Sequence, residues 1–203
     1  MIEINKLTIL NRKIKNYILR FKLKNKDFSI ISSNCNGGII MSDLGVKFNS
    51  PTVNLFFYPS DFIKFVKNIK EYLSYEIVEV KDTGLEYPVG DLNGVKIHFM
   101  HYDSFEEAKN KWEQRKQRVN YNNLFIMFTD RDGCTYENIK EFDELPYKNK
   151  VIFTNKPYKK FKSAYYIEGF ESEDSVGILS EYIDDKYVRY LYKFDIIGWL
   201  NNN

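Results

Sequence analysis

Short runs of apolar residues separated by polar turns are the dominant pattern of this chain of 203 residues. The clearest run, LFIMF at residues 124–128, is apolar at five consecutive positions. A strand with one face in water would alternate apolar and polar residues, so this run predicts a strand that is buried on both faces of a sheet. Similar runs predict further strands at residues 28–33, 52–57, 75–80, 150–154 and 164–167.

Apolar residues spaced three and four positions apart predict helices between these strands. The most regular stripe lies in residues 5–25 and consists of Leu7, Leu10, Ile14, Tyr17 and Phe21. Further helices are expected at residues 60–73, 104–118, 136–142, 176–183 and 193–200, two of them with a serine at the N-cap, Ser60 and Ser104. Alternating strands and helices are typical of parallel α/β folds.

One segment departs from this alternation and predicts a β-hairpin. Asn93 and Gly94 suit a two-residue turn, flanked by residues 87–92 and by a strand that begins at Val95. His98 falls on the side of that strand opposite its apolar residues, so we expect it to face solvent. His101 follows where the strand ends.

These elements predict an α/β fold with a mainly parallel sheet, helices on both of its faces and an inserted β-hairpin. We expect a single domain, because the chain has no low-complexity linker, no internal repeat and a length that suits one core. Its expected parts are a basic amphipathic helix at 1–26, a first βα half at 27–81, the hairpin at 82–102 and a second βα half at 103–203.

Charge is balanced overall but uneven along the chain. The formal total of +2 is too small to indicate nucleic-acid binding. Residues 1–26 hold eight basic residues against Glu3, which gives this segment +7 and leaves −5 for the rest. An amphipathic helix of this kind most often packs its stripe on the domain and leaves its lysines in water. The alternative is peripheral contact with an anionic membrane.

Only two cysteines are present, Cys35 and Cys134, and their spacing indicates neither a zinc site nor a disulfide framework. No apolar run approaches the ~20 residues of a membrane span, and the start of the chain does not resemble a signal peptide. We therefore expect a soluble cytoplasmic protein, peripheral at the inner face of the membrane if its first helix binds lipid.

Polar side chains follow three of the predicted strands, at the ends where parallel sheets gather their ligands. We expect the loops after the first strand and after residues 124–128 to border one cleft, lined by Cys35, Gly37, Asp130 and Asp132. The full set of candidate ligand-binding residues is Asn34, Cys35, Gly37, Gly38, Arg131, Thr154, Asn155 and Lys156, with His101 as a candidate catalytic residue.

Three alternative functions remain open, and Asp130 and Asp132 support the first two as candidate catalytic and metal-binding residues. As a pair of hard oxygen ligands they suit Mg²⁺ or Mn²⁺, which neutralises the diphosphate of a nucleotide-sugar donor in many glycosyltransferases. A second alternative is a phosphatase, because an apolar strand followed by Asp-x-Asp-Gly resembles haloacid-dehalogenase-type phosphatases, in which the first aspartate is the nucleophile. Cys134 stands where that motif expects threonine. The third is a non-catalytic binding or assembly protein, for which the excess of aromatic residues, 16 Tyr and 16 Phe, and the basic first helix would suffice.

Three longer segments resemble a bacterial family of exopolysaccharide biosynthesis proteins. They are SNCNGGIIMSDLG with KFNSPTVNLFF, YPVGDLNGVKIHFMHYDSFEEAKNKWEQRK, and FIMFTDRDGCTYENIKEFDELPYKNKVIFTNKPY. The resemblance covers most of residues 27–199. It implies a role in capsule or extracellular polysaccharide pathways and assigns no catalytic residues. Together with the Asp130 and Asp132 pair, this role leads us to expect a nucleotide sugar or polysaccharide precursor as partner.

Overall fold

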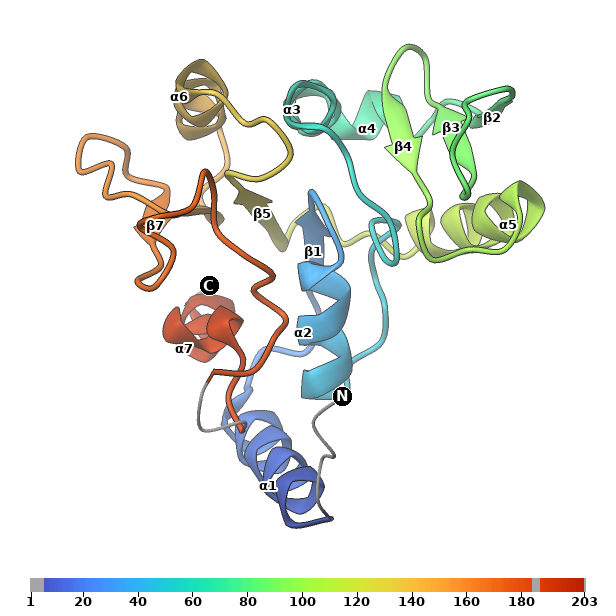
Figure 1. Ribbon diagram of the computed structural model, residues 1–203. Helices are drawn as coiled ribbons and strands as arrows, with labels where there is room; N and C mark the ends of the chain where they lie inside the picture. Colours follow the sequence, from blue (N-terminus) through green and yellow to red (C-terminus); the bar gives the residue numbers. More distant parts are fainter. Residues whose placement is uncertain (1–5, 184–186, 203) are drawn as a thin grey trace.

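A four-stranded parallel sheet forms the centre of the protein, which a computed structural model describes over residues 6–183 and 187–202. The strand order is β1-β5-β6-β7 (Figure 1). The strands are β1 (Ser29–Ser32), β5 (Leu124–Thr129), β6 (Lys150–Thr154) and β7 (Ala164–Tyr166). The α/β fold with a parallel sheet is confirmed.

Parallel pairing brings the polar loops to one edge of this sheet. Ile31 of β1 pairs with Ile126 of β5, and Phe128 of β5 pairs with Ile152 of β6. The residues that follow β1, β5 and β6 therefore leave the sheet on the same side. This is the edge at which the sequence predicts a ligand site.

Helices cover both faces of the sheet, as predicted, because β1, β5 and β6 each present apolar side chains to both sides. One face carries a core with α3 (Pro59–Lys67), α4 (Ile69–Tyr72), α5 (Phe105–Lys116) and α6 (Tyr136–Glu144). The other carries a core with α2 (Asn36–Leu44), the 3₁₀ helix η1 (Tyr190–Lys193), α7 (Ile196–Asn201) and the end of α1 (Lys6–Lys22).

The predicted hairpin is present as β3 (Val89–Asp91) and β4 (Lys96–His98). Asn93 and Gly94 adopt the positive φ values that a tight hairpin turn requires, 52° and 78°. The strand expected at 75–80 pairs with this hairpin as β2 (Val78–Val80) and not with the parallel sheet. The hairpin is thus two strands of a separate three-stranded antiparallel sheet.

The prediction of a strand at 52–57 is wrong. The segment forms a single antiparallel bridge, between Phe56 and His98, and Asn54 turns the chain with a φ of 63°. The apolar pattern of this segment arises because Val53, Leu55 and Phe57 are buried in the core. Asn54, between the first two, is exposed. Alternating burial alone does not require a strand partner.

Three helix predictions also need correction. The helix expected at 60–73 begins at Pro59, with Tyr58 at its N-cap in place of Ser60, and it divides at Asn68 into α3 and α4. Residues 176–183 are not helical, because the backbone groups of residues 179–183 bond to residues 188–191 instead of to one another. The tail helix begins three residues later than predicted. At α5, Ser104 caps the Glu107 amide as predicted.

Two predictions of orientation are wrong. His98 is 7% exposed, because its ring stacks on Phe56 with centroids 4.6 Å apart. The apolar stripe of α1 faces solvent instead of packing on the domain, with Tyr17 71% and Phe21 84% exposed. Within the described parts of the chain, no helix combines the length and apolar character needed to cross a membrane.

Candidate functional site

A cavity of about 540 Å³ opens where β1 and β5 end. Its walls come from the start of α2, the segment between α2 and α3, the residues on either side of the β3–β4 hairpin, the loop after β5 and residues 178–180. The lining residues are Asn34, Cys35, Asn36, Ile39, Phe56, Tyr87, Met100, His101, Arg131, Asp132, Ile178 and Ser180. Its volume is that of sites that bury a small-molecule ligand.

The first wall is the N-terminus of α2. Asn34 joins the ends of two strands, because its Nδ2 donates to Thr129 Oγ1 at 3.0 Å and its Oδ1 accepts the Asn36 amide at 3.2 Å. Cys35 is the N-cap residue and its side chain does not cap the helix. The first amides of a helix have no acceptor within the helix, and its dipole favours a negative charge at this end.

Gly37 and Gly38 let this helix end lie close to the sheet. A Cβ at Gly37 would stand 2.9 Å from Ser32 Cβ, and one at Gly38 would stand 3.1 Å from Val53 Cγ1. Both glycines are buried and are not among the lining residues. The structure accounts for them through packing, and any contact of theirs with a ligand would be made by the backbone.

The second wall is the loop after β5. Asp132 and Gly133 have φ values of 59° and 80° and reverse the chain before α6, which starts with a capping box between Thr135 and Asn138. This reversal places Arg131 and Asp132 against the cavity. Arg131 Nη1 donates to the Gly177 carbonyl at 3.4 Å, so it also contacts the segment that forms the opposite wall.

Asp130 lies behind this loop and organises it. Its Oδ2 accepts the Asn155 amide at 2.7 Å and its Oδ1 accepts the Val176 amide at 2.7 Å. Burial raises the pKa of this carboxyl, and the two amide hydrogen bonds oppose the rise. Since both oxygens are bonded to the backbone, the geometry favours a structural role over nucleophilic attack.

The residues after β6 support the site without lining it. Thr154 and Asn155 are buried, and the Thr154 hydroxyl donates to the Lys156 carbonyl at 2.8 Å. Asn155 Nδ2 donates to the Glu173 carbonyl, which holds the next loop in place. Lys156 is exposed at the same edge of the sheet. Of the ligand residues predicted from sequence, the cavity brings together Asn34, Cys35 and Arg131, with Asp132 and His101.

One wall of the cavity is aromatic, and the sequence did not predict which residues form it. Phe56 and Tyr87 lie on it, with ring centroids 6.2 Å apart, and exposed Met100 and His101 continue it. Buried His98 stacks behind Phe56. The one signal in the sequence was the excess of aromatic residues, 16 Tyr and 16 Phe, which suggests a cleft but gives no positions.

The two cysteines leave the sheet at the same edge, as the parallel topology predicts, but only Cys35 is among the lining residues. Burial raises the pKa of its thiol, which contacts the Leu55 carbonyl at 3.8 Å. Burial, with the nearby charges of Asp130 and Asp132, raises the pKa of Cys134 to about 12. A thiol with a raised pKa is a poor nucleophile at neutral pH.

The carboxylates do not form a ready metal cage. Among the described residues, no group of three or more His, Cys, Asp or Glu side chains is placed to hold an ion. Asp132 is the carboxylate that lines the cavity, whereas Asp130 is committed to amides. Mg²⁺ is often held by one or two carboxylates together with substrate phosphates, and Asp132 fits that arrangement only.

Comparison with known proteins places these features within one family. A family described as "Domain of unknown function (DUF1919)" matches residues 6–201. The chain belongs to the DUF1919 family. The match starts at the first residue of α1 and ends at the last residue of α7. An "Uncharacterized protein" from Haemophilus influenzae (strain ATCC 51907 / DSM 11121 / KW20 / Rd) is 49% identical to this DUF1919 protein over 187 residues, which cover 92% of this chain and 90% of the relative.

Proposed function

We propose that this DUF1919 protein is a glycosyltransferase-like protein of exopolysaccharide biosynthesis that binds a nucleotide sugar in the cavity. The observation that carries the proposal is the meeting, in one cavity, of an anion-favouring helix N-terminus, the Arg131 guanidinium, the Asp132 and His101 side chains and an aromatic wall. A nucleotide sugar combines a diphosphate, two sugar rings and a base. Each of these groups has a counterpart on the walls.

The diphosphate is assigned to the wall formed by α2 and Arg131. Helix N-terminal amides and arginine are the two groups that proteins use most readily for phosphate oxygens. Arg131 lies in the loop after β5, and Asn36 is the first residue of α2, which follows β1. Since β1 and β5 are paired, the two residues lie at the same edge of the sheet. The rings are assigned to Phe56 and Tyr87, because sugar and base rings stack on aromatic side chains.

The proposed reaction needs a base and a stabilised leaving group. His101 takes the proton from the acceptor hydroxyl, whose oxygen attacks the anomeric carbon of the donor sugar. The bond from that carbon to the diphosphate breaks, and the diphosphate leaves with the electron pair. The Arg131 guanidinium and the positive end of the α2 dipole stabilise the negative charge on it. Asp132 accepts from sugar hydroxyls and is the one lining carboxylate that a Mg²⁺ or Mn²⁺ ion on the phosphates would contact.

Titration calorimetry with nucleoside diphosphates and nucleotide sugars tests the proposal. We expect Arg131→Ala to weaken binding about 10- to 100-fold, the usual effect of losing a hydrogen bond to a charged group. Lys156→Ala is the matched control, because Lys156 is a basic residue at the same edge that does not line the cavity. Equal losses in the two variants, or no binding by the wild type, would refute the proposed site.

A non-catalytic binding protein of the same pathway is the second candidate. The observation that favours it is the commitment of Asp130 to two backbone amides, which leaves Asp132 as the carboxylate on the cavity wall. Donor binding that depends on Arg131, with no turnover of any donor and acceptor pair and no effect of His101→Gln, would support this candidate over the transferase.

A further inference from the structure

The outward face of α1 is the largest structural feature that the cavity does not explain. Its stripe residues Leu7, Leu10, Ile14, Tyr17 and Phe21 are between 48% and 84% exposed, and Ile18 beside them is 43% exposed. A row of exposed large apolar side chains on one helix face is typical of a surface that is covered in use. We propose that α1 lies in the plane of an anionic membrane surface, with this stripe in the lipid.

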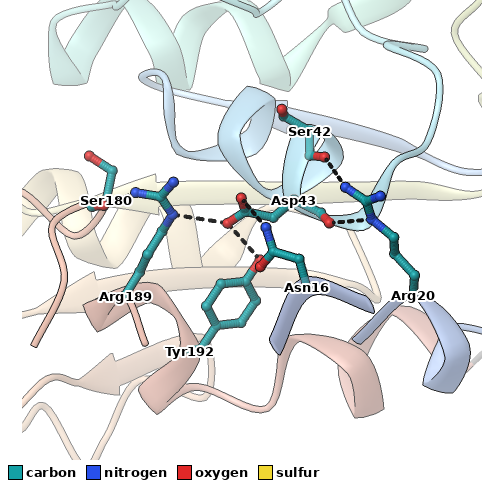
Figure 2. Close-up of polar contacts among 7 residues, drawn as sticks. All are labelled: Asn16, Arg20, Ser42, Asp43, Ser180, Arg189 and Tyr192. Atoms are coloured by element: carbon teal, nitrogen blue, oxygen red, sulfur yellow. Dashed lines mark hydrogen bonds and ion pairs between the residues drawn. The ribbon is translucent and has the colours of Figure 1, made fainter. Parts of the chain in front are cut away.

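The stripe is held outward because the opposite face of α1 is bonded to the domain. Figure 2 shows Asn16 and Arg20 of α1 reaching the end of α2. Asn16 Nδ2 donates to Asp43 Oδ1 at 3.0 Å, and Arg20 Nε donates to the Asp43 carbonyl at 2.8 Å. Thr8 and Leu23, which also lie on this inner face, are buried.

Asp43 is in turn fixed by the C-terminal part of the chain. Its Oδ2 accepts from Arg189 Nε at 2.9 Å and from the Tyr192 hydroxyl at 3.1 Å (Figure 2). Asp43 is buried, so rotating α1 to hide its stripe would leave the Asp43 carboxylate without its Asn16 hydrogen bond and the Asp43 carbonyl without its Arg20 hydrogen bond. That loss is costly in a low-dielectric site. The exposed stripe is therefore part of the folded arrangement.

The positive charge of α1 favours an anionic lipid surface as the partner that covers the stripe. Residues 6–26 contain eight basic residues and no acidic one. At 3.6 residues per turn, Lys6 and Lys13 flank the stripe on one side and Lys15 and Lys22 on the other. Lysines on both borders of an apolar stripe can extend their ammonium groups to the phosphates of lipids while their stems contact the acyl region. The two most exposed stripe residues, Tyr17 and Phe21, are aromatic.

A second copy of the chain is a poorer occupant of the same face. In a two-fold symmetric contact, the same patch meets itself, so each basic border would face another basic border. Residues 6–26 offer no acidic side chain to pair with it. Like charges held together in this way oppose association, whereas an anionic bilayer supplies the missing negative charge.

The test is flotation of the full chain with phosphatidylcholine vesicles that either contain or lack phosphatidylglycerol, across a salt series. We expect binding to the anionic vesicles only, and weaker binding as salt screens the charges. The double variant Lys13→Gln with Lys22→Gln should bind the anionic vesicles ~25-fold more weakly than the wild type, at about fivefold for each charge removed. The control pair, Lys81→Gln with Lys159→Gln, removes two exposed lysines from elsewhere and should change binding little.

The apolar part of the proposal has its own variants. Leu10→Ser with Phe21→Ser should reduce vesicle binding roughly tenfold or more, the effect of losing two large apolar side chains from the buried stripe. Val78→Ser with Leu85→Ser, at side chains that are 60% and 45% exposed, is the control. Thermal unfolding of each variant separates lost binding from lost folding.

Three results would overturn the proposal. The first is no binding to anionic vesicles, and the second is binding that ignores salt and lipid charge. The third is an equal loss in the control variants. A dimer in sedimentation velocity that Leu10→Ser with Phe21→Ser dissociates, without vesicle binding by the wild type, would assign the face to a second copy instead.

Discussion

Asp130 Oδ1 accepts the backbone amide of Val176, 46 positions further along the chain, at 2.7 Å. The other oxygen of the same carboxylate accepts the Asn155 amide, so one side chain joins the ends of β5 and β6 to the segment that carries Ile178 and Ser180. The first aspartate of the Asp-Arg-Asp sequence thus builds the cavity, and the second faces it. The two residues should respond differently to mutation.

We expect Asp130→Asn to destabilise the protein by about 2 kcal/mol, because an amide cannot accept at both positions and places its NH₂ against a backbone N–H. For a chain of this length, this lowers Tm by about 4–8 °C. Asp132→Asn, at an exposed position, should leave Tm unchanged. Under the proposed function it reduces transfer or ligand binding. Calorimetric scans and donor titrations of both variants check the contrast, which reversed results would contradict.

The same geometry predicts how a divalent ion binds. With Asp130 committed to amides, Mn²⁺ should bind weakly to the protein alone and more tightly when a nucleoside diphosphate supplies oxygen ligands. Asp132→Asn should remove most of that gain. Titration calorimetry with Mn²⁺ in the presence and absence of the diphosphate measures both quantities. Tight Mn²⁺ binding without nucleotide, insensitive to Asp132→Asn, would show that this assignment is wrong.

His98 should make stability depend on pH. Burial against Phe56 lowers the pKa of His98 from its ordinary value of 6.5. The unfolded chain therefore takes up a proton at a higher pH than the folded chain, and stability is lost as pH falls below about 6.5 towards the folded-state pKa. A His98→Phe variant should lose less stability than the wild type between neutral pH and that range. Denaturant unfolding at several pH values checks this, with His101→Phe as the exposed control.

Gly37 should be intolerant of a side chain. A Cβ at this position would meet Ser32 Cβ at 2.9 Å and Ile30 Cγ2 at 3.0 Å, both atoms close to the backbone of β1 with little freedom to move. We expect Gly37→Ala to cost about 1–3 kcal/mol through overpacking, although alanine favours helices. Gly84→Ala is a control for lost glycine flexibility, because nothing lies within 4 Å of its Cβ position and its φ is +68°. If strain alone mattered, Gly84→Ala would be the more harmful change.

Several elements could be predicted from sequence because their signals are local. Runs of contiguous apolar residues predicted β5 and β6 correctly, and the Asn93-Gly94 pair predicted the hairpin turn. Parallel topology then placed Asn34, Cys35, Arg131 and Asp132 at one edge. Other errors depend on partners outside the segment itself. Residues 179–183 are held out of a helix by backbone hydrogen bonds to residues 188–191, and no local pattern within 176–183 contains those bonds.

The aromatic wall and the orientation of α1 could not be predicted for the same reason. Phe56 and Tyr87 meet because the small sheet contacts the segment between α2 and α3, through the bridge from Phe56 to His98. The stripe of α1 shows that the helix is amphipathic but not which side faces the domain. Asp43 decides this, because it bonds the polar side of α1.

The last prediction concerns Asp43 itself. Asp43→Asn removes the negative charge that faces the Arg189 guanidinium, in a site where both side chains are largely buried. Burial and the Asp43 charge raise the pKa of Tyr192, so that hydroxyl stays protonated and remains a donor. An asparagine there keeps one acceptor but leaves a cation without its counter-ion, which should cost about 3 kcal/mol and lower Tm by roughly 6–12 °C.

The matched control is Glu76→Gln, which breaks the exposed ion pair with Lys109 at 2.7 Å. That change should leave Tm unmoved, because solvent screens an exposed pair. Hydrogen exchange adds a local measurement. Amides of α1 should exchange faster in Asp43→Asn than in the wild type, because Asn16 of α1 loses its carboxylate acceptor, while amides of β5 keep their protection. Unchanged exchange in α1 would show that Asp43 does not hold this helix in its outward orientation.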